Sequence, residues 1–169
     1  SLLATKRIEK RTEKQTVSKT PSQTLLAKTV DGAKIEWMKG TYTGQVSNGV
    51  PHGQGSWVHP DLGRFTGEFE NGSLNGQGTF TKYGGINTGM RTLNYVGNFK
   101  DNLFHGHGTW SHPNGQKYVG EFSNGKRNGQ GVYTYSDGSR YIGQFKFGER
   151  DGWGTYTWAH GPEYVGEFK

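Results

Sequence analysis

Histidine side chains are the candidates for metal chemistry in this sequence. His105 and His107 flank a single glycine, and imidazole nitrogens are frequent ligands of zinc and other transition metals. His52 stands in the same His-Gly-x-Gly context as His105, but the corresponding position elsewhere holds other polar residues, namely Asn75, Asn128 and Asp151. A polar turn residue accounts for this set as well as a metal ligand does. We therefore expect no metal site.

Glutamate recurs in Gly-Glu-Phe motifs at Glu68, Glu121 and Glu167. Acid–base catalysis depends on individually placed groups, and a series repeated along the chain does not fit that requirement. The sequence also contains no Gly-x-Ser-x-Gly nucleophile motif and no Gly-x-x-x-x-Gly-Lys-Ser/Thr phosphate loop. We expect neither catalysis, nor a cofactor, nor a small-molecule substrate.

The composition excludes several classes of protein. The chain has 169 residues, no cysteine, 29 glycines and 23 aromatic residues. The lack of cysteine excludes disulfide scaffolds and cysteine-ligated zinc or iron–sulfur sites. The apolar runs are far shorter than the roughly 20 residues that cross a bilayer. Aliphatic residues are scarce, so any core must consist of aromatic rings packed against glycine.

Positive charge is concentrated in a polar N-terminal arm, residues 1–24. Residues 1–25 carry a net charge of +4 out of a total of +6, so the rest of the chain is close to neutral. A nucleic-acid groove would instead collect Lys and Arg on the folded body, and we expect no nucleic-acid partner. We interpret the arm as a segment that docks on another subunit or is attracted to an anionic membrane. The residues assigned to this role are Lys6, Arg7, Lys10, Arg11 and Lys14.

An internal repeat determines the elements that must position any functional residue. An aromatic residue begins each unit and defines its position 0, so that the units begin at Tyr42, Phe65, Tyr95, Tyr118, Tyr141 and Tyr164. Their spacing is 23 residues except for one of 30, which places an insertion within 84–94. Every complete unit has glycine at +2, +11 and +13 and an aromatic residue at +15. Agreement across five complete units predicts a repeat architecture.

The offsets within the unit predict a β-hairpin. Because side chains alternate along a strand, positions 0, +2 and +4 share one face, as do +11, +13 and +15 of a second strand. Asn-Gly pairs such as Asn71-Gly72 and Asn75-Gly76 supply the turn between the strands. We therefore predict an all-β fold, an elongated single-layer antiparallel β-meander of stacked hairpins. In its core, each hairpin lays its rings into the glycine notches of the next.

The segment Tyr118-Val-Gly-Glu-Phe-Ser-Asn-Gly-Lys-Arg-Asn-Gly-Gln-Gly131 resembles the MORN repeat, whose unit runs Y-x-G-x-F/W-x-x-G-x-x-x/H-G-x-G. The resemblance covers about residues 41–169, with Val46, Asn102 and the insertion as departures. It implies a non-enzymatic module. Many members of the family act as protein-binding or dimerising scaffolds, some of them cytoskeletal, and the family's name records a proposed membrane role. Family membership by itself does not choose the ligand.

Both ends of the predicted sheet depart from the unit. Residues 25–40 are predicted to form a degenerate capping hairpin, with strands at 25–30 and 33–37 and a turn at Asp31-Gly32. The last unit contains only a first strand, up to Lys169. An unpaired strand is a template for another strand, so we expect either a continued chain or a partner at this edge.

The aromatic face is the predicted interaction surface, because a single layer cannot cover both of its own faces. We expect a structural subunit of a larger assembly, which binds a partner protein or a second copy of itself through an aromatic groove and the sheet edge. The alternatives are peripheral attachment to anionic phospholipid and a regulatory domain of a larger enzyme. The lack of cysteine fits an intracellular location, cytoplasmic or organellar, with the cytoskeleton or a membrane as its setting. The rings expected to contact the partner are Trp57, Trp110, Tyr118, Tyr133, Tyr135, Tyr141, Tyr156 and Trp158.

Overall fold

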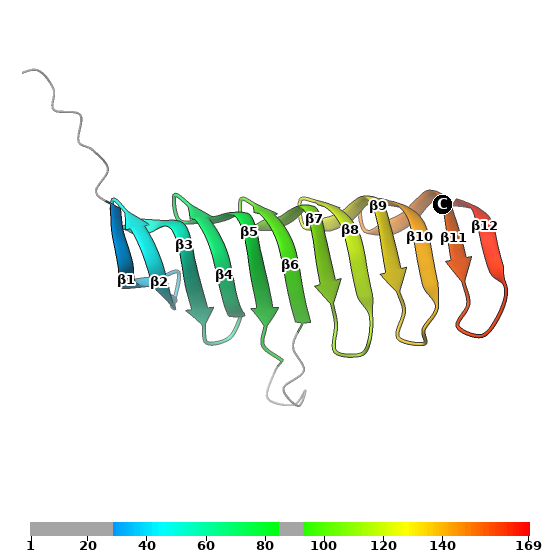
Figure 1. Ribbon diagram of the computed structural model, residues 1–169, viewed down its shortest axis with the longest axis horizontal. Coiled ribbons are helices and arrows are strands. Elements are labelled where there is room, and N and C mark those ends of the chain that lie inside the picture. Colours follow the sequence, from blue (N-terminus) through cyan, green and yellow to red (C-terminus); the bar gives the residue numbers. More distant parts are fainter. Residues whose placement is uncertain (1–28, 85–92) are drawn as a thin grey trace, which may run out of the picture.

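The part of the chain that the structure describes, residues 29–84 and 93–169 of a computed structural model, forms one sheet of twelve strands. The strands pair antiparallel in sequence order, so the sheet is a continuous meander from β1 to β12 (Figure 1). This arrangement confirms the predicted all-β, single-layer fold. The strands are β1 (Thr29–Trp37), β2 (Gly40–Ser47), β3 (Val50–His59), β4 (Gly63–Glu70), β5 (Ser73–Lys82), β6 (Leu93–Lys100), β7 (Leu103–Ser111), β8 (Lys117–Ser123), β9 (Lys126–Thr134), β10 (Arg140–Lys146), β11 (Glu149–Thr157) and β12 (Glu163–Phe168).

Each complete repeat is one hairpin, closed by a two-residue turn at positions +6 and +7. Both turn residues have positive φ, for example 49° at Asn71 and 82° at Gly72, as in a type I′ turn. Asparagine and glycine tolerate this conformation best, and Asp101-Asn102 and Phe147-Gly148 adopt it as well. Figure 1 shows these short turns along the upper edge of the sheet and the longer loops between repeats, such as that after β7, along the lower edge.

A β-bulge interrupts every hairpin between its turn and its loop. In the fourth repeat, Glu121 of β8 lies opposite three residues of β9, 128–130. The Glu121 side chain fills the gap, since its Oε1 accepts the backbone N–H of Gln130 at 2.9 Å. Gln45 and Gln144 accept the equivalent N–H in their own repeats. In these three repeats the acidic or amide residue at position +3 therefore replaces a main-chain acceptor that the bulge removes from the ladder.

Glycine at position +11 gives the bulge side chain its space. A β-carbon at Gly129 would lie 2.7 Å from the carboxylate carbon of Glu121, and φ at Gly129 is 86°. The pair Asn75-Gly76, predicted as part of a turn, lies within β5 and belongs to the same kind of bulge. The +11 glycine therefore accommodates the +3 side chain, and not an aromatic ring as the sequence predicted.

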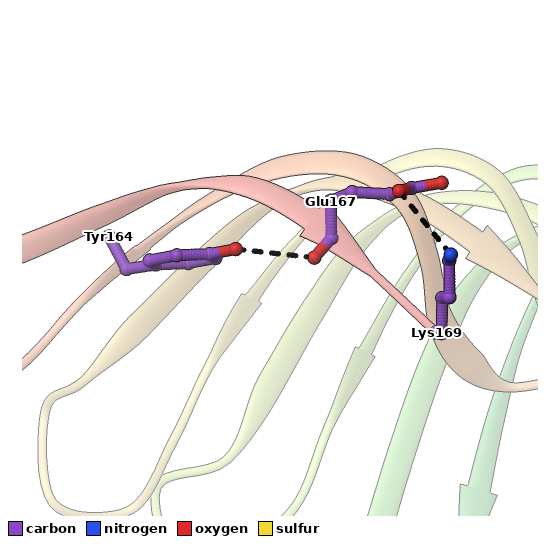
Figure 2. Close-up of polar contacts among 3 residues, drawn as sticks. All are labelled: Tyr164, Glu167 and Lys169. Atoms are coloured by element: carbon purple, nitrogen blue, oxygen red, sulfur yellow. Dashed lines mark hydrogen bonds and ion pairs between the residues drawn. The ribbon is translucent and has the colours of Figure 1, made fainter.

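The hydroxyl of the tyrosine at position 0 binds the same bulge from the inner side. Tyr118 Oη donates to the main-chain oxygen of Glu121 at 2.9 Å. Figure 2 shows this contact in the last repeat, where the hydroxyl of Tyr164 points at the main-chain oxygen of Glu167. The carboxylate of Glu167 lies 3.6 Å from Lys169 Nζ. Ring and bulge therefore hold each other in place.

The hairpins curl over their own position 0 rings. Residues four apart on a flat strand are separated by about 13 Å, yet the ring centroids of Tyr118 and Phe122 are 5.0 Å apart. In the third repeat, Phe104 of the second strand also stacks on Tyr95 at 3.8 Å. The strands curve over at the top of Figure 1, where the short turns lie. This curl buries the position 0 ring of all five complete repeats, namely Tyr42, Phe65, Tyr95, Tyr118 and Tyr141.

Each position 0 ring lies over the glycines of its own hairpin, and not over those of the next hairpin as predicted. A β-carbon at Gly131 would lie 2.4 Å from the Tyr118 side chain, which belongs to the same repeat. The ring at position +4 joins neighbouring repeats. Phe145 packs edge-to-face on Tyr118 at 5.0 Å and on Tyr141 at 5.2 Å, a favoured geometry for aromatic pairs. The same alternation forms a ladder of rings along the sheet.

Hydrogen bonds between successive turns also join the repeats. The N–H at position +7 donates to the carbonyl at position +9 of the preceding repeat. Gly148 donates in this way to Arg127, and Gly125 to Phe104, each at 2.9 Å. The turns are therefore held at a fixed spacing along the upper edge, and the side chains beside them occupy defined places.

The first described strand corrects the predicted capping hairpin. Residues 29–37 form the single strand β1, and the tight turn that follows is Met38-Lys39. Asp31-Gly32 forms a bulge within β1, where the register shifts between Val30 and Ala33. Positive φ at glycine suits a bulge as well as a turn, which is why the predicted turn at Asp31-Gly32 was wrong. Residues 25–28 of the predicted hairpin lie outside the described residues.

Alkaline pH is expected to unfold the sheet. Burial raises the pKa of Tyr95 and of Tyr118 from 10.0 to about 12. A raised pKa in the folded state means that folding favours the neutral phenol, so stability is fully present below about pH 10 and is lost as pH rises towards 12. Urea midpoints measured across this range should fall, together with the appearance of tyrosinate absorbance. A midpoint that stays constant up to pH 12 would contradict the prediction.

Candidate functional site

Three of the rings predicted to contact a partner are part of the core. Tyr118 and Tyr141 are 0% exposed and Tyr133 is 7% exposed. Sequence reasoning expected them to remain accessible because a flat single layer cannot cover its own face. The curl of each hairpin provides that cover, so these three rings support the fold, and only an edge of Tyr133 stays exposed.

The other predicted rings keep part of their surface. Trp57, Trp110, Tyr135 and Tyr156 are partly exposed, and Trp158 is 47% exposed. Trp57 of the first repeat is tied to β1, because its Nε1 donates to the main-chain oxygen of Trp37 at 2.8 Å.

A continuous aromatic cluster lies near the loops of the last two complete repeats. Tyr133 packs on Tyr135 at 4.6 Å, Tyr135 on Tyr156 at 5.6 Å, and Tyr156 on Trp158 at 4.8 Å. We call these four residues the ring cluster. Desolvation raises the pKa of Tyr135 above its ordinary value, although the Arg150 guanidinium nearby opposes this shift. The cluster is therefore apolar in character but bordered by positive charge.

Two arginines lie over the rings of the last two complete repeats. The guanidinium of Arg127 is 4.8 Å from the Tyr133 ring centroid, and that of Arg150 is 5.4 Å from the Tyr156 centroid. Both are within cation–π distance. In the earlier repeats the same position, +9, holds Pro51, Leu74 and Phe104. The described residues contain one ion pair, Glu167–Lys169, so neither arginine has a carboxylate partner among them.

A hollow of about 350 Å³ lies beside Arg127, between the turns and the rings. Six of its ten lining residues are aromatic, and Lys126 and Arg127 supply its positive charge. The hollow is lined by residues 125–127 and 147–148, at and beside two successive turns, and by rings that include Trp110 and Tyr133. We call this hollow the turn groove. It can receive a group that combines negative charge with apolar surface.

Sequence reasoning missed the two most exposed rings of the fifth repeat. Phe147 is 71% exposed at the turn, and Trp153 is 68% exposed on the face opposite the buried rings. Both depart from the repeat. Position +6 otherwise holds Asn or Asp, and position +12 otherwise holds Gln or His. A search for departures from the repeat would have found these residues, as well as Arg127 and Arg150.

Two of the histidines, His59 and His112, support loops through hydrogen bonds to the backbone. His59 Nδ1 accepts the backbone N–H groups of Asp61 and Leu62, each at 3.1 Å. His52 and His105 belong to different repeats, and the Nδ1 of each is buried without a hydrogen-bond partner in residues 29–84 and 93–169. Within those ranges no three His, Asp or Glu side chains gather in a way that could hold a metal ion.

The basic residues assigned to the arm lie outside the described residues, so the structure does not place Lys6, Arg7, Lys10, Arg11 or Lys14. The same holds for residues 85–92, the greater part of the predicted insertion. The ranges that are described include no helix with the length and apolarity needed to span a membrane.

The family comparison agrees with the hairpin architecture. A family model described as the MORN repeat matches residues 42–64, 65–85, 95–117, 118–140 and 141–161, about two thirds of the chain. The chain belongs to the MORN-repeat family. The five matched MORN units begin at the predicted positions 0, and the matches confirm the resemblance found in the sequence. No curated protein matches the chain. MORN repeats are generally non-catalytic modules, often involved in protein or membrane interaction.

Proposed function

We propose that this MORN-repeat chain is a non-enzymatic scaffold that binds a partner protein, or a second copy of itself, along the curled aromatic face. The exposed side of the ring cluster supports the proposal most strongly. Trp158 keeps 47% of its surface exposed although it packs on Tyr156, so the fold does not use its full apolar area. Tryptophan, tyrosine and arginine are the residues enriched at the energetic centres of protein interfaces, and Arg150 lies beside these rings.

The proposal predicts that removing the exposed part of the ring cluster abolishes partner binding. The test is capture of proteins from an extract of the source cells on the immobilised full chain, for the wild type and for the double variant Tyr135→Ala/Trp158→Ala. Position +17 holds Lys82 in the second repeat, so the repeat tolerates the loss of a ring there. We expect retention of specific proteins to fall at least about tenfold, as for hot-spot residues.

Trp153→Ala is the matched control, because it removes an exposed tryptophan from the same repeat on the opposite face. Its captured proteins should equal those of the wild type. Sedimentation of each variant at several concentrations tests the second-copy arrangement in the same way. If all three proteins retain the same partners and the same oligomeric state, the ring cluster is not the binding surface.

Attachment to anionic phospholipid is the second candidate, favoured by the net charge of +4 on residues 1–25. This candidate predicts a different result for the same variants. Co-sedimentation with vesicles that contain phosphatidylserine would depend on salt and on the basic residues of the arm, and would not respond to Tyr135→Ala/Trp158→Ala. Electrostatic attraction of this kind weakens as salt screens it.

A further inference from the structure

Phe147 breaks the repeat where the backbone disfavours a bulky side chain. Its φ of 53° is in the left-handed region, where asparagine and glycine are favoured over bulky residues. In the other repeats, position +6 holds residues that tolerate this conformation, namely Asn48, Asn71, Asp101 and Asn124. The Phe147 ring is outside the buried core and 71% exposed. Folding therefore does not explain this residue, and strained residues of this kind tend to persist where function requires them.

The Phe147 ring borders the turn groove. The lining of the groove also includes Lys126 and Gly148, at and beside the turns, and the rings of Trp110 and Tyr133. A second hollow, of about 220 Å³, continues from Phe147 along Ser123, Asn124, Lys126 and Asn128. An exposed ring at the border of two hollows can cover a side chain that enters either of them.

The charge in the turn groove is not neutralised by the described residues. Lys126 is exposed at the start of β9, and neither Lys126 nor Arg127 forms an ion pair there. Arg127 is held in place, because its Nη2 donates to the main-chain oxygen of Gly148 at 2.6 Å and its guanidinium lies over the Tyr133 ring. A guanidinium has five N–H donors, so its capacity for an anion is not used up by this one bond.

Arg150 lies over aromatic rings one unit further along. Equivalent positions of neighbouring repeats are two strands apart, which is about 10 Å at a strand spacing of about 4.8 Å. An extended chain in the polyproline II conformation has three residues per turn and a rise of about 3.1 Å per residue, so side chains three residues apart lie on one face, about 9 Å from each other. Such a chain, lying across the strands, presents side chains three residues apart to Arg127 and to Arg150.

We propose that the turn groove is the anchor point for an extended acidic segment of a partner protein. One carboxylate binds Lys126 and Arg127, a neighbouring apolar side chain lies between Phe147 and the rings of Trp110 and Tyr133, and a second carboxylate three residues away binds Arg150. The inference rests on the proposed function and names the chemistry of its partner. A phospholipid headgroup would match the charge but would offer no side chain to the six rings of the groove.

The test is selection from a randomised peptide library displayed on phage, with the full chain as target. We expect enriched peptides to carry an acidic residue next to an apolar one, with a second acidic residue three positions away. Affinities of the enriched peptides are then measured for Phe147→Asn, Arg127→Leu and Trp153→Gln. Each variant takes its new residue from the same position of another repeat, as in Asn124, Leu74 and Gln130, so each is expected to fold, and thermal melting verifies this.

The proposal expects the affinity to fall at least tenfold in Phe147→Asn and in Arg127→Leu and to stay within twofold in Trp153→Gln. Peptides without acidic enrichment, or affinities that ignore Phe147 and Arg127, would overturn it. If the peptides instead lose affinity only in Tyr135→Ala/Trp158→Ala, this inference fails and the proposed function stands. If no peptide is enriched, this inference fails, and the capture and sedimentation experiments alone decide the proposed function. Capture of the chain on phosphatidylserine vesicles that is lost in Arg127→Leu would assign the groove to lipid and overturn the proposal.

Discussion

Replacing Gly120 with alanine is expected to lower the free energy of unfolding by about 3 kcal/mol, the upper part of the range for overpacked sites. A methyl carbon at Gly120 would lie 2.5 Å from the main-chain oxygen of Gln130 and 2.6 Å from Cα of Gly131. Both atoms belong to the backbone of β9, so they cannot move without breaking the pairing of β8 with β9. The Tyr118 hydroxyl, 2.7 Å away, blocks the remaining space.

Gly161→Ala is the control for this change. Its new methyl carbon would contact only Trp158 Cβ at 3.6 Å, an ordinary contact distance, and surface substitutions away from special features usually stay within about 0.5 kcal/mol. Urea titrations of both variants, followed by tryptophan fluorescence, give the comparison. Equal midpoints for the two variants would mean that the close approach of β8 and β9 does not require glycine.

Replacing Tyr118 with alanine is expected to cost about 4 kcal/mol, as for other large aromatic side chains removed from a core. Tyr118 is fully buried, and its ring packs on Phe122 and on Phe145 of the next repeat. It also donates the hydrogen bond to Glu121 that holds the bulge. The variant therefore loses contacts within its own hairpin and across the junction to the next one.

Tyr118→Phe separates these contributions, because Phe65 occupies the same position in the second repeat without a hydroxyl. This variant loses the hydrogen bond alone and should cost about 1 kcal/mol. Hydrogen exchange shows which strands lose stability in each variant. In Tyr118→Ala, protection should fall first in β8 to β10, since repeats contact mainly their neighbours. A uniform loss over all strands would show that the sheet unfolds as one unit.

The fold was predictable because the repeat consists of residue types that each favour only a few local structures. Asn71-Gly72 occupies the turn that its sequence indicated, and the alternation of Tyr118, Gly120 and Phe122 places all three on one face of β8. Five repetitions of these signals excluded a helical interpretation. Single examples would have been weaker, as Asp31-Gly32 shows, since the same dipeptide type forms a bulge and not a turn.

The curl of the hairpins was not predictable from the alternation of side chains along each strand. Alternation assigns side chains to faces but treats each strand as straight, whereas the bulge opposite Glu121 bends the hairpin and brings Phe122 onto Tyr118. Tyr118, Tyr133 and Tyr141 were assigned to the surface for this reason. The signal was present in the Asn-Gly-x-Gly sequence at 128–131, where a left-handed glycine breaks the ladder, but its meaning depends on the side chain at +3 across the hairpin.

The turn groove was missed because the repeat was used only as a consensus. Phe147 and Arg127 carry information through their difference from Asn124 and Leu74, the residues at the same positions of other repeats. The fold requires neither Phe147 nor Arg127, because other repeats form the same hairpin with Asn124 or Leu74 at these positions. The proposed role of Phe147 and Arg127 depends on how two adjacent turns and the rings beside them come together, and the sequence alone does not give this arrangement.

Gln45, Glu121 and Gln144 each close the bulge of their own hairpin, as Gln144 does at Trp153. The contacts that join one 23-residue unit to the next also recur along the sheet, as the turn hydrogen bonds of Gly125 and Gly148 show. Copying one unit in or cutting one out therefore re-forms equivalent junctions. Each unit adds two strands, about 9.6 Å. The number of units therefore sets the length of the sheet in steps of one hairpin.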